Sequence, residues 1–209
     1  MGQVHRKSSE QSQHVRLPDN IGKERLAVNK KLVIGGGYKD GEKAVCVTLT
    51  TAEELETLKS NHEEADTRLL LHAKYATHPR SRIIIQSPDT DVLVLCVAHF
   101  DEIPCEELWF RTGVNDRLRY IPVHVVSEKL GQKLCTSLPA FHALTGCDTT
   151  SSLTGVGKKK AWEALCRSEP QQESLALVGQ SAVLDNETSM KCEEFICTLY
   201  PAVKKKTEC

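Results

Sequence analysis

Apolar residues gather in short runs through the middle of the chain, and each run has the length of a β-strand. The run at residues 82–86, Arg-Ile-Ile-Ile-Gln, is continuous enough to predict a strand buried on both faces. Weaker runs at 31–34 and 44–49 predict two earlier strands. Runs at 108–111 and 119–126 predict two later ones, joined by a Gly-Val-Asn-Asp turn.

Helical patterns alternate with these strands and dominate after them. Thr51 followed three residues later by Glu54 has the form of a capping box, which predicts a short helix to about Lys59. The apolar segment 91–100 fits either a helix or a second buried segment. Further helices are predicted at 63–76, 137–145, 157–166, 171–178 and 191–199.

Strands that alternate with helices and then give way to helices predict an α/β core followed by a helical region. The first residues are polar and poor in apolar side chains, which is typical of a disordered segment. The predicted organisation is a disordered or loosely attached arm at 1–30, an α/β core at 31–135, a helical region at 136–200 and a basic tail at 201–209.

Composition narrows the class of protein. The 27 Lys and Arg residues nearly balance the 28 Asp and Glu residues, so only local basic patches can support nucleic-acid binding. Nine scattered Cys residues indicate reduced thiols rather than a secreted disulfide framework. No apolar run approaches the roughly 18 residues of a membrane span, and no signal-peptide pattern begins the chain. We therefore expect an intracellular protein, nuclear or cytoplasmic, with no membrane partner.

Two acidic pairs lie at positions where carboxylates could bind a cation or take part in catalysis. Glu64 and Asp66 lie at a predicted helix start, where they would also complement the helix dipole. Asp89 and Asp91 directly follow the strand at 82–86, and ligands of α/β sheets bind just outside the carboxyl ends of strands. A turn with a helix N-cap explains one Asp there equally well, but two neighbouring carboxylates repel each other unless a cation or donor lies between them.

A third segment joins an acidic residue to a basic helix start. Asp148 lies in a Gly-Cys-Asp turn, and the sequence Gly-Val-Gly-Lys-Lys-Lys-Ala follows at 155–161. Two glycines before a helix expose backbone N–H groups that can hold a phosphate, and lysines add positive charge beside it. The candidate nucleic-acid-binding residues are Gly155, Gly157, Lys158, Lys159 and Lys160.

In this order the three segments resemble the flap-endonuclease (5′-nuclease) branch of the PIN-like nucleases, over about residues 61–166. That family has an E-A-[ED] motif at a helix start, a D-x-D motif after a buried strand, and a G-x-D motif. The last leads into a helix–two-turn–helix, or helix-hairpin-helix, of the form GIGxxxA. The matching segments are Glu64-Ala65-Asp66, Asp89-Thr90-Asp91, Gly146-Cys147-Asp148 and residues 155–161.

The resemblance implies a PIN-like (Rossmann-like) fold, with a mostly parallel sheet flanked by helices and a C-terminal helix–two-turn–helix region. It also implies metal-dependent, structure-selective cleavage of phosphodiester bonds in DNA, or alternatively RNA. Carboxylates favour Mg²⁺ or Mn²⁺ over zinc, here at a two-cation site. A monovalent cation at the hairpin is implied as well. The implied catalytic and metal-binding residues are Glu64, Asp66, Asp89, Asp91 and Asp148.

The chain departs from the family at its front. Family members begin with a buried strand bearing a metal-binding Asp and carry a further acid after a later strand. Neither has a counterpart here, since Asp19 and Asp40 follow no convincing buried strand. We therefore expect an incomplete or diverged PIN-like core. A second interpretation stays open, that of a catalytically inactive PIN-like module that binds nucleic acid or another partner.

Two other chemistries fit the sequence less well. A zinc site lacks a second Cys or His pair at metal-ligand spacing. A hydrolase using Cys147 or Ser87 with His142 or His124 lacks the G-x-S-x-G or G-x-C-x-G pattern of a nucleophile elbow.

Overall fold

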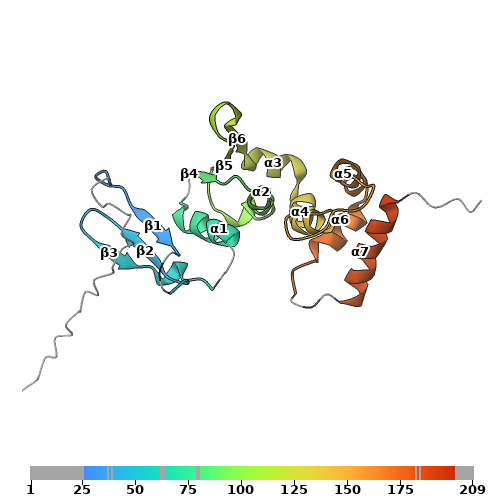
Figure 1. Cartoon of the computed structure of the whole chain (residues 1–209), viewed down its shortest axis with the longest axis horizontal. Coiled ribbons are helices and arrows are strands. Elements are labelled where there is room, and N and C mark those ends of the chain that lie inside the picture. Colours follow the sequence, from blue (N-terminus) through green and yellow to red (C-terminus); the bar gives the residue numbers. More distant parts are fainter. Residues whose placement is uncertain are drawn as a thin grey trace, which may run out of the picture. The chain divides into compact units, whose positions relative to one another are not determined.

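The computed structural model is an α/β protein, with seven α-helices and two three-stranded sheets among its described residues (Figure 1). Two compact units, residues 1–64 and 65–209, have separate sets of contacts. Among the described residues, no helix combines the length and apolar character that a membrane span requires. The described residues are 26–36, 38, 40–61, 65–78, 81–181, 183 and 185–200.

The first unit is an antiparallel meander. Strands β1 (Leu32–Gly35), β2 (Ala44–Val47) and β3 (Ala52–Glu54) pair in that order, and a 3₁₀ turn at Glu56–Leu58 follows. Val45 and Val47 are completely buried, so the central strand supplies the apolar interior of this unit. The strands predicted at 31–34 and 44–49 are confirmed, with shifted ends.

The helix predicted at 51–59 is wrong, because strand β3 occupies its start. The Thr51 hydroxyl lies 2.9 Å from the Thr48 hydroxyl, within the tight turn between β2 and β3. Glu54 pairs across the sheet with Val45 and forms an ion pair of 2.7 Å with Lys43. Both partners of the expected capping box are therefore used by the hairpin.

The second unit begins with a mixed sheet of β4 (Arg82–Gln86), β5 (Glu107–Thr112) and β6 (Arg119–Pro122). Only β4 and β5 run parallel, whereas β5 and β6 are antiparallel. Three of the four strand pairs in the described residues are antiparallel, so the mostly parallel sheet of a PIN-like fold is not confirmed.

Helices α1 (Ala65–Ala76) and α3 (Val123–Leu130) pack on this sheet, and α2 (Thr90–Ala98) packs against both helices around one hydrophobic core. Short 3₁₀ turns lie at Phe100–Glu102 and Asn115–Arg117. The buried residues of this core include Ile85, Leu108, Phe110, Val92, Cys96 and Val123. Burial raises the pKa of the Cys96 thiol to about 12, which keeps it protonated.

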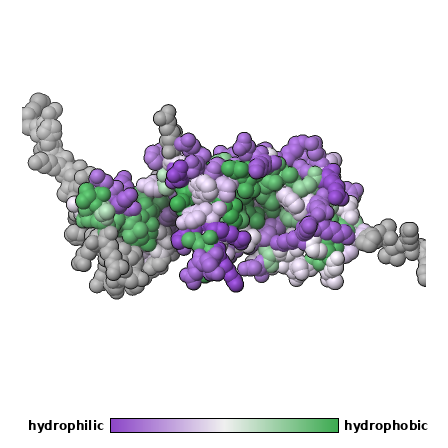
Figure 2. Space-filling model, turned by 90° about the horizontal axis from the view of Figure 1, so that it is seen from above, coloured by the Kyte–Doolittle hydropathy of each residue, from purple (hydrophilic) through white to green (hydrophobic). Residues whose placement is uncertain are grey.

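Two details of the predicted strands are corrected by this packing. The strand at 82–86 is an edge strand buried on one face, and Ile84 on its other face is 54% exposed. Figure 2 shows apolar residues at the molecular surface, bordered by hydrophilic ones. The strand predicted at 119–126 ends at Pro122, because Val123, Val126 and Leu130 have helical spacing and turn one face of α3 into the core.

The C-terminal part is helical, as predicted. It comprises α4 (Gln132–Leu144), α5 (Lys158–Cys166), α6 (Glu169–Ala176) and α7 (Asn186–Leu199), which enclose a second core. Helix α4 packs against both α2 and α6, with Cys135 in the first core and Phe141 in the second. The boundary expected after residue 135 therefore falls inside a helix that both cores share.

A pH-dependent contribution to stability is expected from Glu107. Its carboxylate accepts hydrogen bonds from Arg82, at 2.6 and 2.9 Å, and from the Trp109 indole, at 2.7 Å. These bonds lower its pKa to about 2, from 4.5 in an unfolded chain. The contribution is complete above about pH 4.5 and is lost as pH falls toward 2. The difference in urea-unfolding free energy between wild type and Glu107→Gln should shrink over this range, and a constant difference would contradict the assignment.

Candidate functional site

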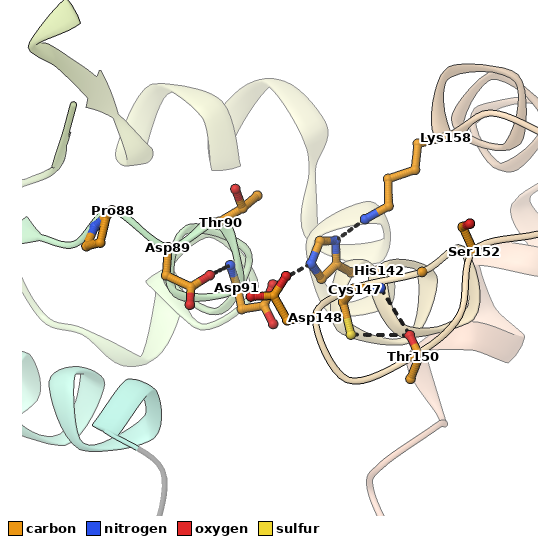
Figure 3. Close-up of a pocket in the computed structure, with 11 residues that line it drawn as sticks. Pro88, Asp89, Thr90, Asp91, His142, Cys147, Asp148, Thr150, Ser152 and Lys158 are labelled. Carbon is orange, nitrogen blue, oxygen red and sulfur yellow. Dashed lines mark hydrogen bonds and ion pairs between the residues drawn. The ribbon is translucent and has the colours of Figure 1, made fainter.

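An open cleft of about 720 Å³ lies in the second unit, where the loop after β4 faces the end of α4 and the start of α5 (Figure 3). It collects residues from three separate segments of the chain. The lining residues are Pro88, Asp89, Thr90, Asp91, His142, Gly146, Cys147, Asp148, Thr150, Ser152 and Lys158. The predicted acidic motifs after β4 and after α4 thus meet in one place, together with the first lysine of the basic helix.

Asp89 and Asp91 hold different positions at the start of α2. Asp89 is the N-cap, and its Oδ1 accepts a hydrogen bond of 2.8 Å from the Asp91 backbone N–H. The Asp89 N–H in turn donates to the Ser87 hydroxyl at 3.1 Å. The capping interpretation of the motif is therefore right for Asp89. Asp91 lies in the first turn of α2, and the side chains of both residues line the cleft.

Asp91 is linked across the cleft to helices α4 and α5. Its Oδ1 lies 2.7 Å from Nε2 of His142, and Nδ1 of His142 lies 2.8 Å from Nζ of Lys158 (Figure 3). The His142 side chain is 14% exposed and that of Asp91 29% exposed. This chain of contacts connects the D-x-D segment to the start of the basic helix.

Asp148 is exposed in a tight turn that follows α4. The turn is closed by the Cys147 N–H, which donates to the Thr150 carbonyl at 3.2 Å, and by the Thr150 hydroxyl, which donates to the Ala143 carbonyl at 2.6 Å. Hydrogen bonds with the hydroxyls of Thr149 and Thr150 lower the pKa of the Cys147 thiol. The turn therefore presents Asp148 and a thiol with increased acidity beside the acidic start of α2.

The predicted basic helix start is confirmed as the beginning of α5, and its three lysines have different contacts. Gly155 has a φ of +75°, Val156 is buried, and Gly157 directly precedes α5. Lys158 contacts His142, whereas Nζ of Lys160 donates to the Leu199 carbonyl at 2.9 Å, at the end of α7. Lys160 thus stabilises a helix C-terminus. Lys159 is exposed on the first turn of α5.

The other two predicted carboxylates, Glu64 and Asp66, have different outcomes. Glu64 lies outside the described residues. Asp66, in the first turn of α1, is absent from the cleft lining formed by the described residues. Over the same described part of the chain, no three His, Cys, Asp or Glu side chains form a group that could hold one metal ion.

His142 lines the cleft but was not among the predicted site residues, and it appeared only in the less favoured hydrolase alternative. Its hydrogen-bond partners in the described residues are Asp91 and Lys158, not Cys147. The available signal was its position six residues before Asp148, in an otherwise apolar helix end. A tertiary contact to Asp91, 51 positions away, has no signature in a single sequence.

No family model, curated protein or solved structure matches the chain. The PIN-like resemblance stays a prediction that rests on the order and context of the motifs.

Proposed function

We propose that this cleft binds Mg²⁺ or Mn²⁺ through one or two of the carboxylates of Asp89, Asp91 and Asp148, and acts on phosphodiester bonds of nucleic acid. The observation that carries the proposal is the convergence of these three aspartates, from two distant segments, in one open cleft beside Lys158. DNA is the favoured substrate and RNA the alternative, as the resemblance to PIN-like nucleases suggests.

The charges of the cleft support a cation. Three aspartates line it against one lysine and one histidine, so its net charge is negative. A phosphodiester would be repelled there unless positive charge were added. Mg²⁺ is commonly held by one or two carboxylates together with substrate phosphates and water, rather than by a complete protein cage. That mode of binding fits a cleft whose described residues form no three-ligand group.

Different groups of the cleft would bind the phosphate and the cation. Lys158 and the backbone N–H groups at the start of α5 attract a phosphate, and Gly157 keeps the approach to them open. One or two of the carboxylates of Asp89, Asp91 and Asp148 would hold the cation, which would supply activation of water and stabilisation of a leaving oxygen. The second cation, the monovalent cation and the PIN-like ancestry rest on the resemblance.

The test is a cleavage assay on flap, hairpin and single-stranded DNA and RNA, with Mg²⁺, Mn²⁺ or EDTA. We expect cation-dependent cleavage by wild type, reduced to the EDTA level in Asp89→Asn/Asp91→Asn. Because Asn at position 89 can still cap α2, circular dichroism should show a folded control.

Equal activity in wild type and this variant would contradict the enzyme assignment. Salt-sensitive nucleic-acid binding without any cleavage would instead favour the inactive binding module.

A further inference from the structure

We propose that Lys158, His142 and Asp91 form a hydrogen-bond relay in which His142 is a positioning residue for Asp91. In this relay, Lys158 and the Asp91 carboxylate together select the Nε2–H tautomer of the His142 imidazole, and His142 fixes the orientation of that carboxylate. The positioning role rests on the proposed cation-binding function of the cleft, whereas the relay itself is a property of the protein alone.

The direction of the relay follows from the donors available. A lysine ammonium can only donate hydrogen bonds, so Nδ1 of His142 must accept at the 2.8 Å contact with Lys158. The imidazole proton is then on Nε2, which donates to Oδ1 of Asp91 at 2.7 Å. Reversed roles would place a hydrogen of Nδ1 against the ammonium and remove the donor that faces Asp91. The relay therefore runs from the lysine to the carboxylate.

The surroundings of His142 hold the imidazole in place. Its neighbour Phe141 is anchored in the second core, in edge-to-face contact with Trp162 of α5 and Phe195 of α7. The His142 side chain is itself mostly buried. A ring fixed on one side by α4 and bonded on the other to α2 and α5 has little freedom to reorient.

The relay leaves one Asp91 oxygen for a ligand. Oδ1 is used by His142, while Oδ2 has no hydrogen-bond partner among the described residues. A carboxylate held through one oxygen presents the other in a constant direction, as partners of metal ligands commonly do. Asp89 serves the cap of α2 through Oδ1 in a similar way. Both acids of the D-x-D segment are therefore oriented by the protein before a cation arrives.

The tautomer is tested first, without any ligand. In a long-range ¹H–¹⁵N NMR spectrum of histidine-labelled protein, the ring signals of residue 142 are identified as those lost in His142→Gln. We expect the Nε2–H tautomer in wild type and a mixture of tautomers in Lys158→Met/Asp91→Ala, which loses both partners of the ring. Each single variant keeps one partner that favours Nε2–H. An Nδ1–H or doubly protonated ring at pH 7.5 in wild type, or a pattern that the double variant leaves unchanged, would overturn the relay.

Replacing His142 with Gln or with Asn tests its two contacts separately, because each amide can stand in for only one ring nitrogen. The amide nitrogen of Gln reaches near the position of Nε2 and can still donate to Asp91. Asn reaches only near Nδ1 and loses Asp91. We expect Mn²⁺ affinity to fall roughly 10–100-fold in His142→Asn, by analogy with other partners of metal ligands, and much less in His142→Gln. His99→Gln, at the other end of α2, is the control.

The outcomes separate the relay from the proposed function. Equal Mn²⁺ affinity in wild type, His142→Asn and His142→Gln would refute the positioning role even if wild type cleaves nucleic acid. Equal losses in both His142 variants would refute it as well. A wild-type protein that binds Mn²⁺ at Asp91 without cleaving would refute only the nuclease function. A wild-type protein that binds no Mn²⁺ refutes the cation site and the positioning role together, and the NMR spectrum then decides the relay.

Discussion

Replacing Gly146 with alanine should destabilise the protein by about 2–5 kcal/mol, because two penalties coincide at this position. Gly146 has a φ of +102°, in a region that residues with a Cβ rarely adopt. An added Cβ would also lie 2.6 Å from Cα of Ser152, a backbone atom that cannot rotate away. The turn that carries Cys147 and Asp148 would have to open, so the proposed cleavage should fall along with stability.

Gly155→Ala is the matched comparison, because only one of the two penalties applies. Gly155 also has a positive φ, of +75°, but a Cβ added at this position would meet no atom within 4 Å. Its replacement should cost about 1–2 kcal/mol. Urea unfolding followed by circular dichroism measures both variants. Equal losses would show that the contact with Ser152 does not exist and that the Asp148 turn is wrongly placed.

Replacing Phe195 with alanine should cost about 3–5 kcal/mol of unfolding free energy. Phe195 is completely buried on α7 and makes an edge-to-face contact with Phe141, at a centroid distance of 6.4 Å. Removing the ring would leave a cavity among α4, α5 and α7, which hold His142 and Lys158 in position. The expected result is an unfolding midpoint at much lower urea concentration, with an unchanged slope if the transition remains two-state.

Met190→Ala provides the comparison on the same helix. Met190 is 68% exposed, so its replacement should change the unfolding free energy by no more than about 0.5 kcal/mol. A Phe195→Ala variant as stable as Met190→Ala would mean that the second core is not packed as described.

Local pattern predicted most of the elements in the second unit. The apolar run at 82–86 is β4, and Leu69, Leu70 and Ala73 lie on the core-facing side of α1. The Gly-Val-Gly segment ends at the start of α5, because glycine residues permit the backbone turn and the following Lys-Lys-Lys-Ala run favours a helix. These features depend on neighbours within a few positions, so one sequence is enough to predict them.

Local sequence patterns did not predict which strands pair, or in which direction. The segment at 51–59 has the residues of a capping box, yet pairing with β2 is the stronger constraint and makes residues 52–54 a strand. Strand directions in the second sheet depend on which backbone groups find partners across the chain, and β6 turns back antiparallel beside β5. Propensity supplies only tenths of a kcal/mol per residue, so tertiary pairing readily overrides it.

In the candidate site, too, local motifs could be predicted from the sequence and contacts between distant segments could not. By itself the sequence determined which acids follow β4 and α4, and that a basic helix start comes next, because each motif is a local arrangement of residues. The tertiary structure alone decided that Asp89, Asp91 and Asp148 line one cleft and that Asp66 does not line it within the described residues. It also decided that His142 stands between Asp91 and Lys158. Contacts between helices are set by the packing of their buried faces. The polar residues at the helix ends do not determine that packing, so their sequence does not predict which partner comes within hydrogen-bond distance.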